Sequence, residues 1–140
     1  MSEPRTPLLE EAEDSIWLVR LPLPWPLAIV NVYLLRRGDG YLLIDTGLKT
    51  EKSLAALEEA LGHLGLGWGS LREIVISHMH PDHVGAAAEM RRRSAAPVRM
   101  HVTEALLVAP RGSGDFFEKT ETYLREHGVP QEHIRKMKKS

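Results

Sequence analysis

A run of apolar residues that ends in a histidine cluster limits the folds open to this chain more than any other feature. Residues 72–77 (Arg-Glu-Ile-Val-Ile-Ser) run directly into His78. The run is apolar on both faces, as in a central strand covered by helices, and unlike a strand with one face in water. The sequence therefore predicts a sheet in which this strand lies inside, with helices packed against it.

The segments on either side supply strands and helices in the required order. The predicted elements are strands over 16–20, 29–35 and 41–45, a helix over 50–64, the strand over 72–77, a helix over 84–93, a strand over 97–101 and helices over 103–109 and 116–127. The sequence Arg37-Gly38-Asp39-Gly40 has the chemistry of a hairpin turn. We therefore predict an α/β (α+β) fold: an antiparallel hairpin that continues as β–α–β–α–β, forming a mixed sheet with helices on at least one face.

Charge and composition indicate which partners this chain can bind and in which cellular compartment we expect it. The chain has 140 residues with a formal charge of −1, so no strong field favours nucleic acid or an anionic membrane. The most apolar stretch, 16–35, contains Arg20 and three prolines and is not a membrane helix. No secretory signal is visible, so we expect a cytoplasmic protein. Residues 1–14 are polar and acidic and are predicted to be a loose terminus, and 15–140 to belong to one domain.

The histidine cluster predicts a metal site. The chain has no cysteine, so any metal ligand must be a His, Asp or Glu side chain. His78, His80, Asp82 and His83 converge in a loop at the carboxyl end of a strand, where sites in such sheets commonly lie. Three neutral imidazoles and a carboxylate suit zinc, or iron or manganese, better than magnesium or calcium. Asp45, at the end of another strand, is expected to accept an imidazole N–H or to orient a metal-bound water.

The pattern His78-x-His80-x-Asp82-His83, preceded by Asp45-Thr-Gly, resembles the metallo-β-lactamase superfamily. The Pro-rich lead into Asn31-x-Tyr-Leu and the helical segment 115–135 resemble its hydroxyacylglutathione-hydrolase-like branch. The resemblance implies two divalent metal ions, the first held by His78 and His80 and the second by Asp82 and His83. It also implies that Asp82 is catalytic by positioning the bridging hydroxide, and that Asp45 contacts the ligands rather than the metal.

The family has an αββα fold of two similar halves, and this chain resembles only the N-terminal half, with helices on the outer face of the sheet. Family members complete the metal site with a His, an Asp and a final His from the second half. The later candidates here, His101, Asp115, His127 and His133, do not stand in the expected context. We therefore expect two half-sites of two ligands each. Both would be incomplete, because catalytic zinc normally has three protein ligands. We also expect an uncovered apolar sheet face that favours self-association.

By this resemblance the protein is a metallo-hydrolase that uses metal-bound hydroxide to cleave a small-molecule ester, thioester or lactone. Hydrolysis of β-lactams or phosphodiesters is the alternative within the same class, although the balanced charge disfavours a nucleic-acid substrate. The alternative from a different class is a catalytically silent half-domain that acts in assembly with a partner chain.

Overall fold

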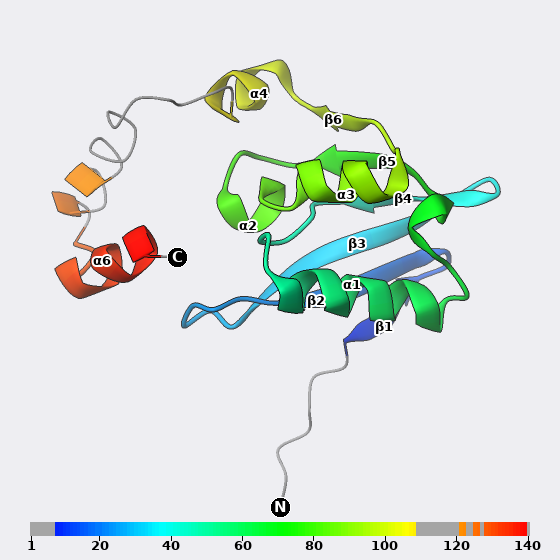
Figure 1. Ribbon diagram of the computed structural model, residues 1–140, viewed down its shortest axis with the longest axis horizontal. Helices are drawn as coiled ribbons and strands as arrows, with labels where there is room; N and C mark the ends of the chain where they lie inside the picture. The colour runs from blue at the N-terminus through cyan, green and yellow to red at the C-terminus, as the bar shows by residue number, and fades with distance from the viewer. Residues whose placement is uncertain (1–7, 109–120, 123–124, 127, 140) are drawn as a thin grey trace, which may run out of the picture. The chain divides into compact units, whose positions relative to one another are not determined.

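The computed structural model describes residues 8–108, 121–122, 125–126 and 128–139, which belong to two compact units, Met1–Leu107 and Val108–Ser140 (Figure 1). The strands are β1 (Leu9–Glu13), β2 (Ile16–Pro22), β3 (Ile29–Arg37), β4 (Gly40–Ile44), β5 (Leu71–Ile76) and β6 (Val98–Met100). The helices are α1 (Glu51–His63), the 3-10 turn η1 (Trp68–Ser70), α2 (Pro81–Val84), α3 (Ala87–Ser94), α4 (Val102–Val108) and α6 (Gln131–Lys139). Within the described residues, none of these helices has the length and apolar character needed to span a membrane. Most of the helix predicted over 116–127 lies outside the described residues.

The six strands form one mixed sheet, which confirms the predicted fold class. They are ordered β1-β2-β3-β4-β5-β6, the same as their order in the chain. The first four pair antiparallel, whereas β4 with β5 and β5 with β6 pair parallel. The predicted hairpin turn joins β3 to β4, with Gly38 in the left-handed region at φ 58°. The parallel part of the sheet brings the carboxyl ends of β4 and β5 side by side.

Strand β1 was not predicted, and the expectation of a loose terminus over 1–14 is wrong for Leu9–Glu13. Its acidic sequence hides the usual alternation of a strand. The segment pairs with β2 through the backbone, and Arg20 of β2 forms a 2.6 Å ion pair with Glu10. Pairing at a sheet edge requires backbone groups rather than apolar side chains, so the sequence carried little signal for it.

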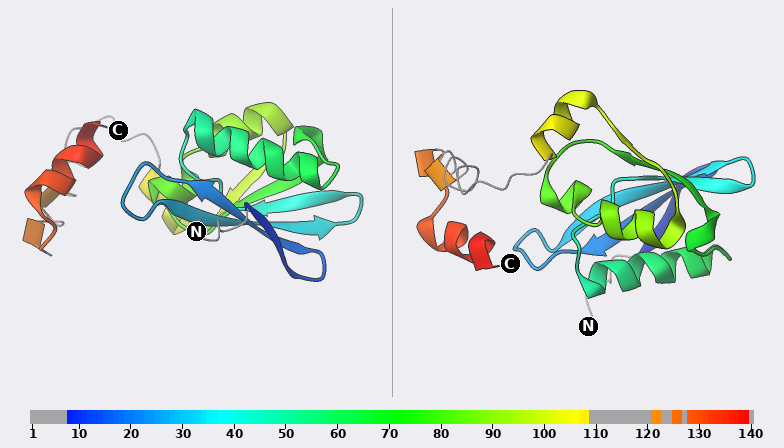
Figure 2. Two further views of the ribbon diagram at one scale, coloured as in Figure 1. Left: turned by 90° about the horizontal axis from the view of Figure 1, so that it is seen from below. Right: turned by 45° about the horizontal axis from the view of Figure 1, so that its top comes forward.

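Helices α1 and α3 pack on one face of the sheet (Figure 2). The predicted helix over 50–64 is confirmed as α1, and the Thr50 hydroxyl caps it by accepting the backbone N–H of Ser53 at 3.1 Å. Leu57 and Leu61 of its predicted stripe are fully buried. Helix α3 adds the fully buried Met90. The fully buried large side chains of the sheet are Val19, Leu21, Val32, Leu34, Leu43 and Ile74.

The helix predicted over 84–93 is present as α3 but begins only at Ala87, and an interruption separates it from the short helix α2, which was not predicted. The interruption lies at Gly85, where an added Cβ would collide with the carbonyl oxygen of Pro81 and lie 3.2 Å from that of Gly47. The next residue, Ala86, donates its backbone N–H to the Thr46 hydroxyl at 3.2 Å. This close approach packs the chain between α2 and α3 against the end of β4, which a helical period alone does not predict.

The opposite face of the sheet is covered by neither α1 nor α3. It carries apolar side chains that are only partly buried: Ile16, Leu18, Tyr33, Leu35, Leu42, Ile44 and Val75. We call these residues the second sheet face. At its border Glu73 forms ion pairs with both Arg37 and Arg99, so the apolar residues have a charged rim.

Candidate metal centre

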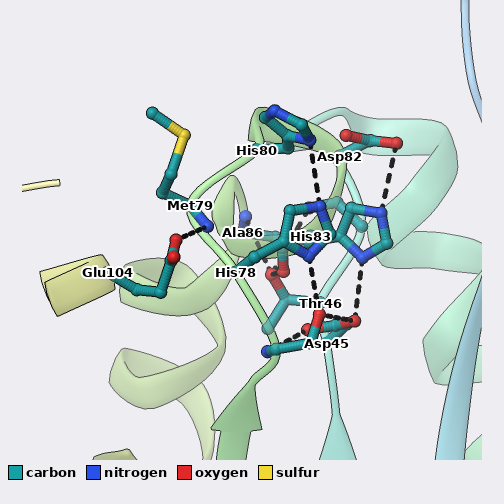
Figure 3. Close-up of polar contacts among 11 residues, drawn as sticks. Asp45, Thr46, His78, Met79, His80, Asp82, His83, Ala86 and Glu104 are labelled. Carbon is teal, nitrogen blue, oxygen red and sulfur yellow. Dashed lines mark hydrogen bonds and ion pairs between the residues drawn. The ribbon is translucent and has the colours of Figure 1, made fainter. Parts of the chain in front are cut away.

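The histidine cluster lies where the parallel strands β4 and β5 end. Residues 77–80 follow β5, and Asp45-Thr46 follow β4, with the Asp45 N–H bonded to the Val75 carbonyl at 2.8 Å. The backbone N–H of Thr46 donates to the His83 carbonyl at 2.8 Å, and its hydroxyl donates to the same oxygen at 2.8 Å. The sheet topology and these contacts bring the two predicted motifs together (Figure 3).

Asp45 is the centre of a hydrogen-bond network. Its side chain is almost fully buried and accepts three hydrogen bonds. One carboxylate oxygen, Oδ1, accepts the backbone N–H of Ser77 at 2.7 Å. The other, Oδ2, accepts the Ser77 hydroxyl at 2.7 Å and Nδ1–H of His83 at 2.8 Å. The expected contact between Asp45 and an imidazole is present, and it joins the end of β4 to α2.

This network assigns the tautomers of two histidines. The Ser77 hydroxyl has one proton, which it donates to Asp45, so its oxygen must accept Nδ1–H from His78 at 2.8 Å. His83 likewise donates Nδ1–H to Asp45. Both neutral rings therefore present the lone pair of Nε2, which is the form that binds a metal.

The four predicted ligands form two pairs of donor atoms. Nε2 of His78 lies 3.0 Å from Nδ1 of His80, and Nε2 of His83 lies 3.5 Å from Oδ2 of Asp82. The rings of His78 and His83 are themselves close, with centroids 4.1 Å apart. Two ligands of a tetrahedral zinc ion, each about 2.0–2.1 Å from the metal, stand about 3.3 Å apart. The donor types and the separation within each pair therefore fit a divalent cation.

Among the described residues, no three His, Asp or Glu side chains are grouped as a metal site. Each pair supplies two metal ligands. The hydrogen bond between His78 and His80 uses the two atoms nearest to the first position, so a bound ion would replace it. The assignment of these four residues as ligands remains a prediction.

Of the later histidines, the structure describes His101 and His133. His101 follows β6 and is exposed, and its Nδ1 accepts the backbone N–H of Thr103 at 3.2 Å at the start of α4. His133 is exposed on α6 in the second unit. His127 and Asp115 lie outside the described residues.

Two residues of the site were not predicted. Ser77 connects Asp45 to His78, and Glu104 of α4 accepts the backbone N–H of Met79 at 2.8 Å. The only sequence signal for Ser77 was a hydroxyl residue directly before the first histidine. Glu104 gave no signal, because a surface helix commonly carries a glutamate.

Comparison with known proteins finds similar sequences. The family model of the metallo-beta-lactamase superfamily matches residues 25–137. The "Probable metallo-hydrolase YqjP" of Bacillus subtilis (strain 168) is 33% identical over 72 residues, which are 51% of this chain and 22% of that protein. The "Probable metallo-hydrolase YybB" of the same organism is 26% identical over 97 residues, which are 69% of this chain and 41% of that protein.

Solved structures share the fold. A metallo-beta-lactamase family protein from Thermus thermophilus superposes with a TM-score of 0.70 at 31% identity, covering 90% of this chain and 42% of that one. The chain therefore spans less than half the length of each of these relatives.

Proposed function

The chain belongs to the metallo-beta-lactamase superfamily, and from that premise we propose that it acts as a metal-dependent hydrolase of small esters, thioesters or lactones. The proposal assigns it to the hydroxyacylglutathione-hydrolase-like branch. The observation that carries the proposal is the Asp45 network, which keeps the ring proton of both His78 and His83 on Nδ1 and so leaves the lone pair of Nε2 to bind a metal. A buried carboxylate that sets the tautomer of two clustered histidines is the arrangement expected around a metal site.

In this proposal His78 and His80 hold one cation, and Asp82 and His83 hold a second. Zinc is favoured by three neutral imidazoles and a carboxylate, with iron or manganese as alternatives. When bound, such ions lower the pKa of water and polarise the bond to be cleaved. In the proposal Asp82 also orients the attacking water, and the support for this role is that its carboxylate is an acceptor beside His83.

The remaining ligands come from outside these four residues. Each donor pair has two members, whereas a catalytic zinc ion normally has three protein ligands. We infer that a further segment, in the same polypeptide or in a partner chain, completes both positions. The relatives' greater length is compatible with this inference.

The test measures zinc binding and thioester hydrolysis in three proteins: the wild-type chain, His80→Ala and His133→Ala. We expect the His80 variant to lose most of its zinc affinity and any hydrolysis that the wild-type chain shows, because it lacks one of the two ligands of the first pair. His133 is exposed on α6, so its variant should match the wild type. Hydrolysis retained by the His80 variant would contradict the site assignment.

A second candidate function rests on the second sheet face. Apolar side chains from β2, β3, β4 and β5 are only partly buried there, and the charged rim around Glu73 resembles the border of an interface. We propose, as the alternative, a catalytically silent half-domain that associates with a second chain through this face. Sedimentation together with zinc stoichiometry separates the two functions. A monomer with two tightly bound ions supports the hydrolase, and an associating chain with weak zinc binding supports the half-domain.

A further inference from the structure

We propose that Glu104 is a positioning residue that holds the segment His78-Met79-His80 in place for metal binding. The inference rests on the proposed metal site. Its basis is a single contact: the Glu104 carboxylate oxygen Oε2 accepts the backbone N–H of Met79 at 2.8 Å. Met79 stands between the two histidines of the first donor pair, so its peptide groups are shared with both.

Two carboxylates from different elements hold this loop. Figure 3 shows Glu104 reaching the Met79 amide from α4, whereas Asp45 contacts the site from the end of β4. Asp45 accepts the N–H of Ser77, one residue before His78, and Glu104 accepts the N–H one residue after it. The backbone is thus fixed on both sides of His78. Since the direction of a ring follows from its backbone, the two contacts together orient the His78 imidazole.

The contact is not a by-product of apolar packing by α4. No described side chain of this helix is buried, and Val102 and Leu106 are 66% and 72% exposed. Holding the glutamate side chain in one rotamer costs conformational entropy. The hydrogen bond to Met79 must offset this cost, because a glutamate without such a bond would stay mobile in solvent. The start of the helix is itself fixed, because His101 accepts the Thr103 N–H. Glu104 lies in the first turn, on the part of α4 that this cap orders.

The experiment compares three substitutions in the full chain. Glu104→Ala removes the acceptor, Glu104→Gln keeps an acceptor oxygen without the charge, and Glu59→Ala removes an exposed glutamate of α1 that pairs with His63 at 3.5 Å. Amide exchange of Met79 is measured by NMR in the metal-free chain, and zinc affinity by titration calorimetry. Loss of a group that orients ligands typically weakens metal binding by about 10–100-fold.

For Glu104→Ala we expect about tenfold weaker zinc binding and at least about tenfold faster exchange of the Met79 amide. The Gln variant should stay within about threefold of the wild type in both measurements, because it restores the hydrogen bond. Glu59→Ala should change neither. An Ala variant with normal zinc affinity overturns the inference, whether or not Met79 exchanges faster.

The two proposals fail in different ways. A wild-type chain that binds no zinc contradicts the proposed function, and the Glu104 contact is then decided by Met79 exchange alone. If the Ala variant is unfolded, Glu104→Met decides, because it keeps the length of the side chain without an oxygen acceptor. Faster exchange of Met79 with weaker zinc binding supports the contact, and wild-type values of both overturn it.

Discussion

Replacing Asp45 by asparagine should change the tautomer of two ligand histidines, His78 and His83, without unfolding the protein. Asparagine has nearly the same shape, and it tolerates the left-handed backbone of this position, φ 63°. Its amide oxygen can still accept the Ser77 N–H. Its NH₂ group, however, donates where Oδ2 accepted, toward the Ser77 hydroxyl and toward Nδ1 of His83. Every contact is kept, and two of them are reversed in direction.

The reversal changes which ring nitrogen is free. His83 must then accept at Nδ1 and carry its proton on Nε2. Ser77, now an acceptor from the amide, donates its own proton to Nδ1 of His78, so that ring also carries its proton on Nε2. Zinc binding has to undo both hydrogen bonds. At about tenfold for each ligand ring we expect affinity to fall by about 100-fold, which is about 2.8 kcal/mol.

The free energy of unfolding should change by less than about 1 kcal/mol, because no buried group loses its partner. Asp45→Ala is the contrasting variant. It leaves three donors without an acceptor and puts alanine in a left-handed conformation, so it should cost at least about 3 kcal/mol of stability. Zinc calorimetry, urea unfolding and ¹⁵N NMR of the imidazoles measure the three quantities. Metal-free Asp45→Asn protein whose rings keep their proton on Nδ1 would refute the reasoning.

Three further outcomes are expected. Gly85→Ala should destabilise the chain by about 1–3 kcal/mol in urea unfolding, because its Cβ collides with a backbone carbonyl, whereas Gly62→Ala, with open space around it inside α1, should stabilise it by about 0.5–1 kcal/mol. Leu42→Lys on the second sheet face should reduce self-association in sedimentation without unfolding the chain, and unchanged association would argue against that face. Hydrogen bonds from Arg92, which has the larger effect, and from Arg93 lower the pKa of Glu89 from 4.5 to about 2. The stability that these bonds contribute is therefore complete above pH 4.5 and disappears as the pH falls through about 2. Between pH 5 and pH 2 the free energy of unfolding should therefore depend less on pH in Glu89→Gln than in the wild type.

Most of the fold followed from the period of apolar residues. The capped helix α1 combines a helical period with a cap residue, the hairpin β3–β4 combines two apolar strands with a turn sequence, and strand β5 is an apolar run. All three are present. Strand β1 and the interruption before α3 were missed because they depend on contacts between segments distant in sequence. An acidic segment pairs through its backbone, and the chain after Gly85 is held by the backbone N–H of Ala86, which bonds to the Gly47 carbonyl and the Thr46 hydroxyl. Neither interaction leaves a periodic pattern.

The candidate site divides in the same way. The donors could be proposed from residue type and spacing, since histidine and aspartate in this pattern are unusual outside metal sites. Ser77 and Glu104 could not, because both act on the histidines through hydrogen bonds, one to a ring nitrogen and one to a backbone amide. Many residue types can provide such a bond. Only the three-dimensional arrangement shows which serine and which glutamate do.

The residue type at position 45 is better explained by the histidines than by the turn. A left-handed conformation costs an ordinary L-residue about 1–2 kcal/mol, and glycine adopts it freely. Gly47, two residues later, takes the same region at φ 73°. Glycine at position 45 would relieve the strain but accept no hydrogen bond, and asparagine would reverse two of the three. Only a carboxylate accepts from Ser77 twice and from His83 once, so the backbone strain is offset by the interaction that leaves both Nε2 atoms unprotonated, as a metal ligand must be.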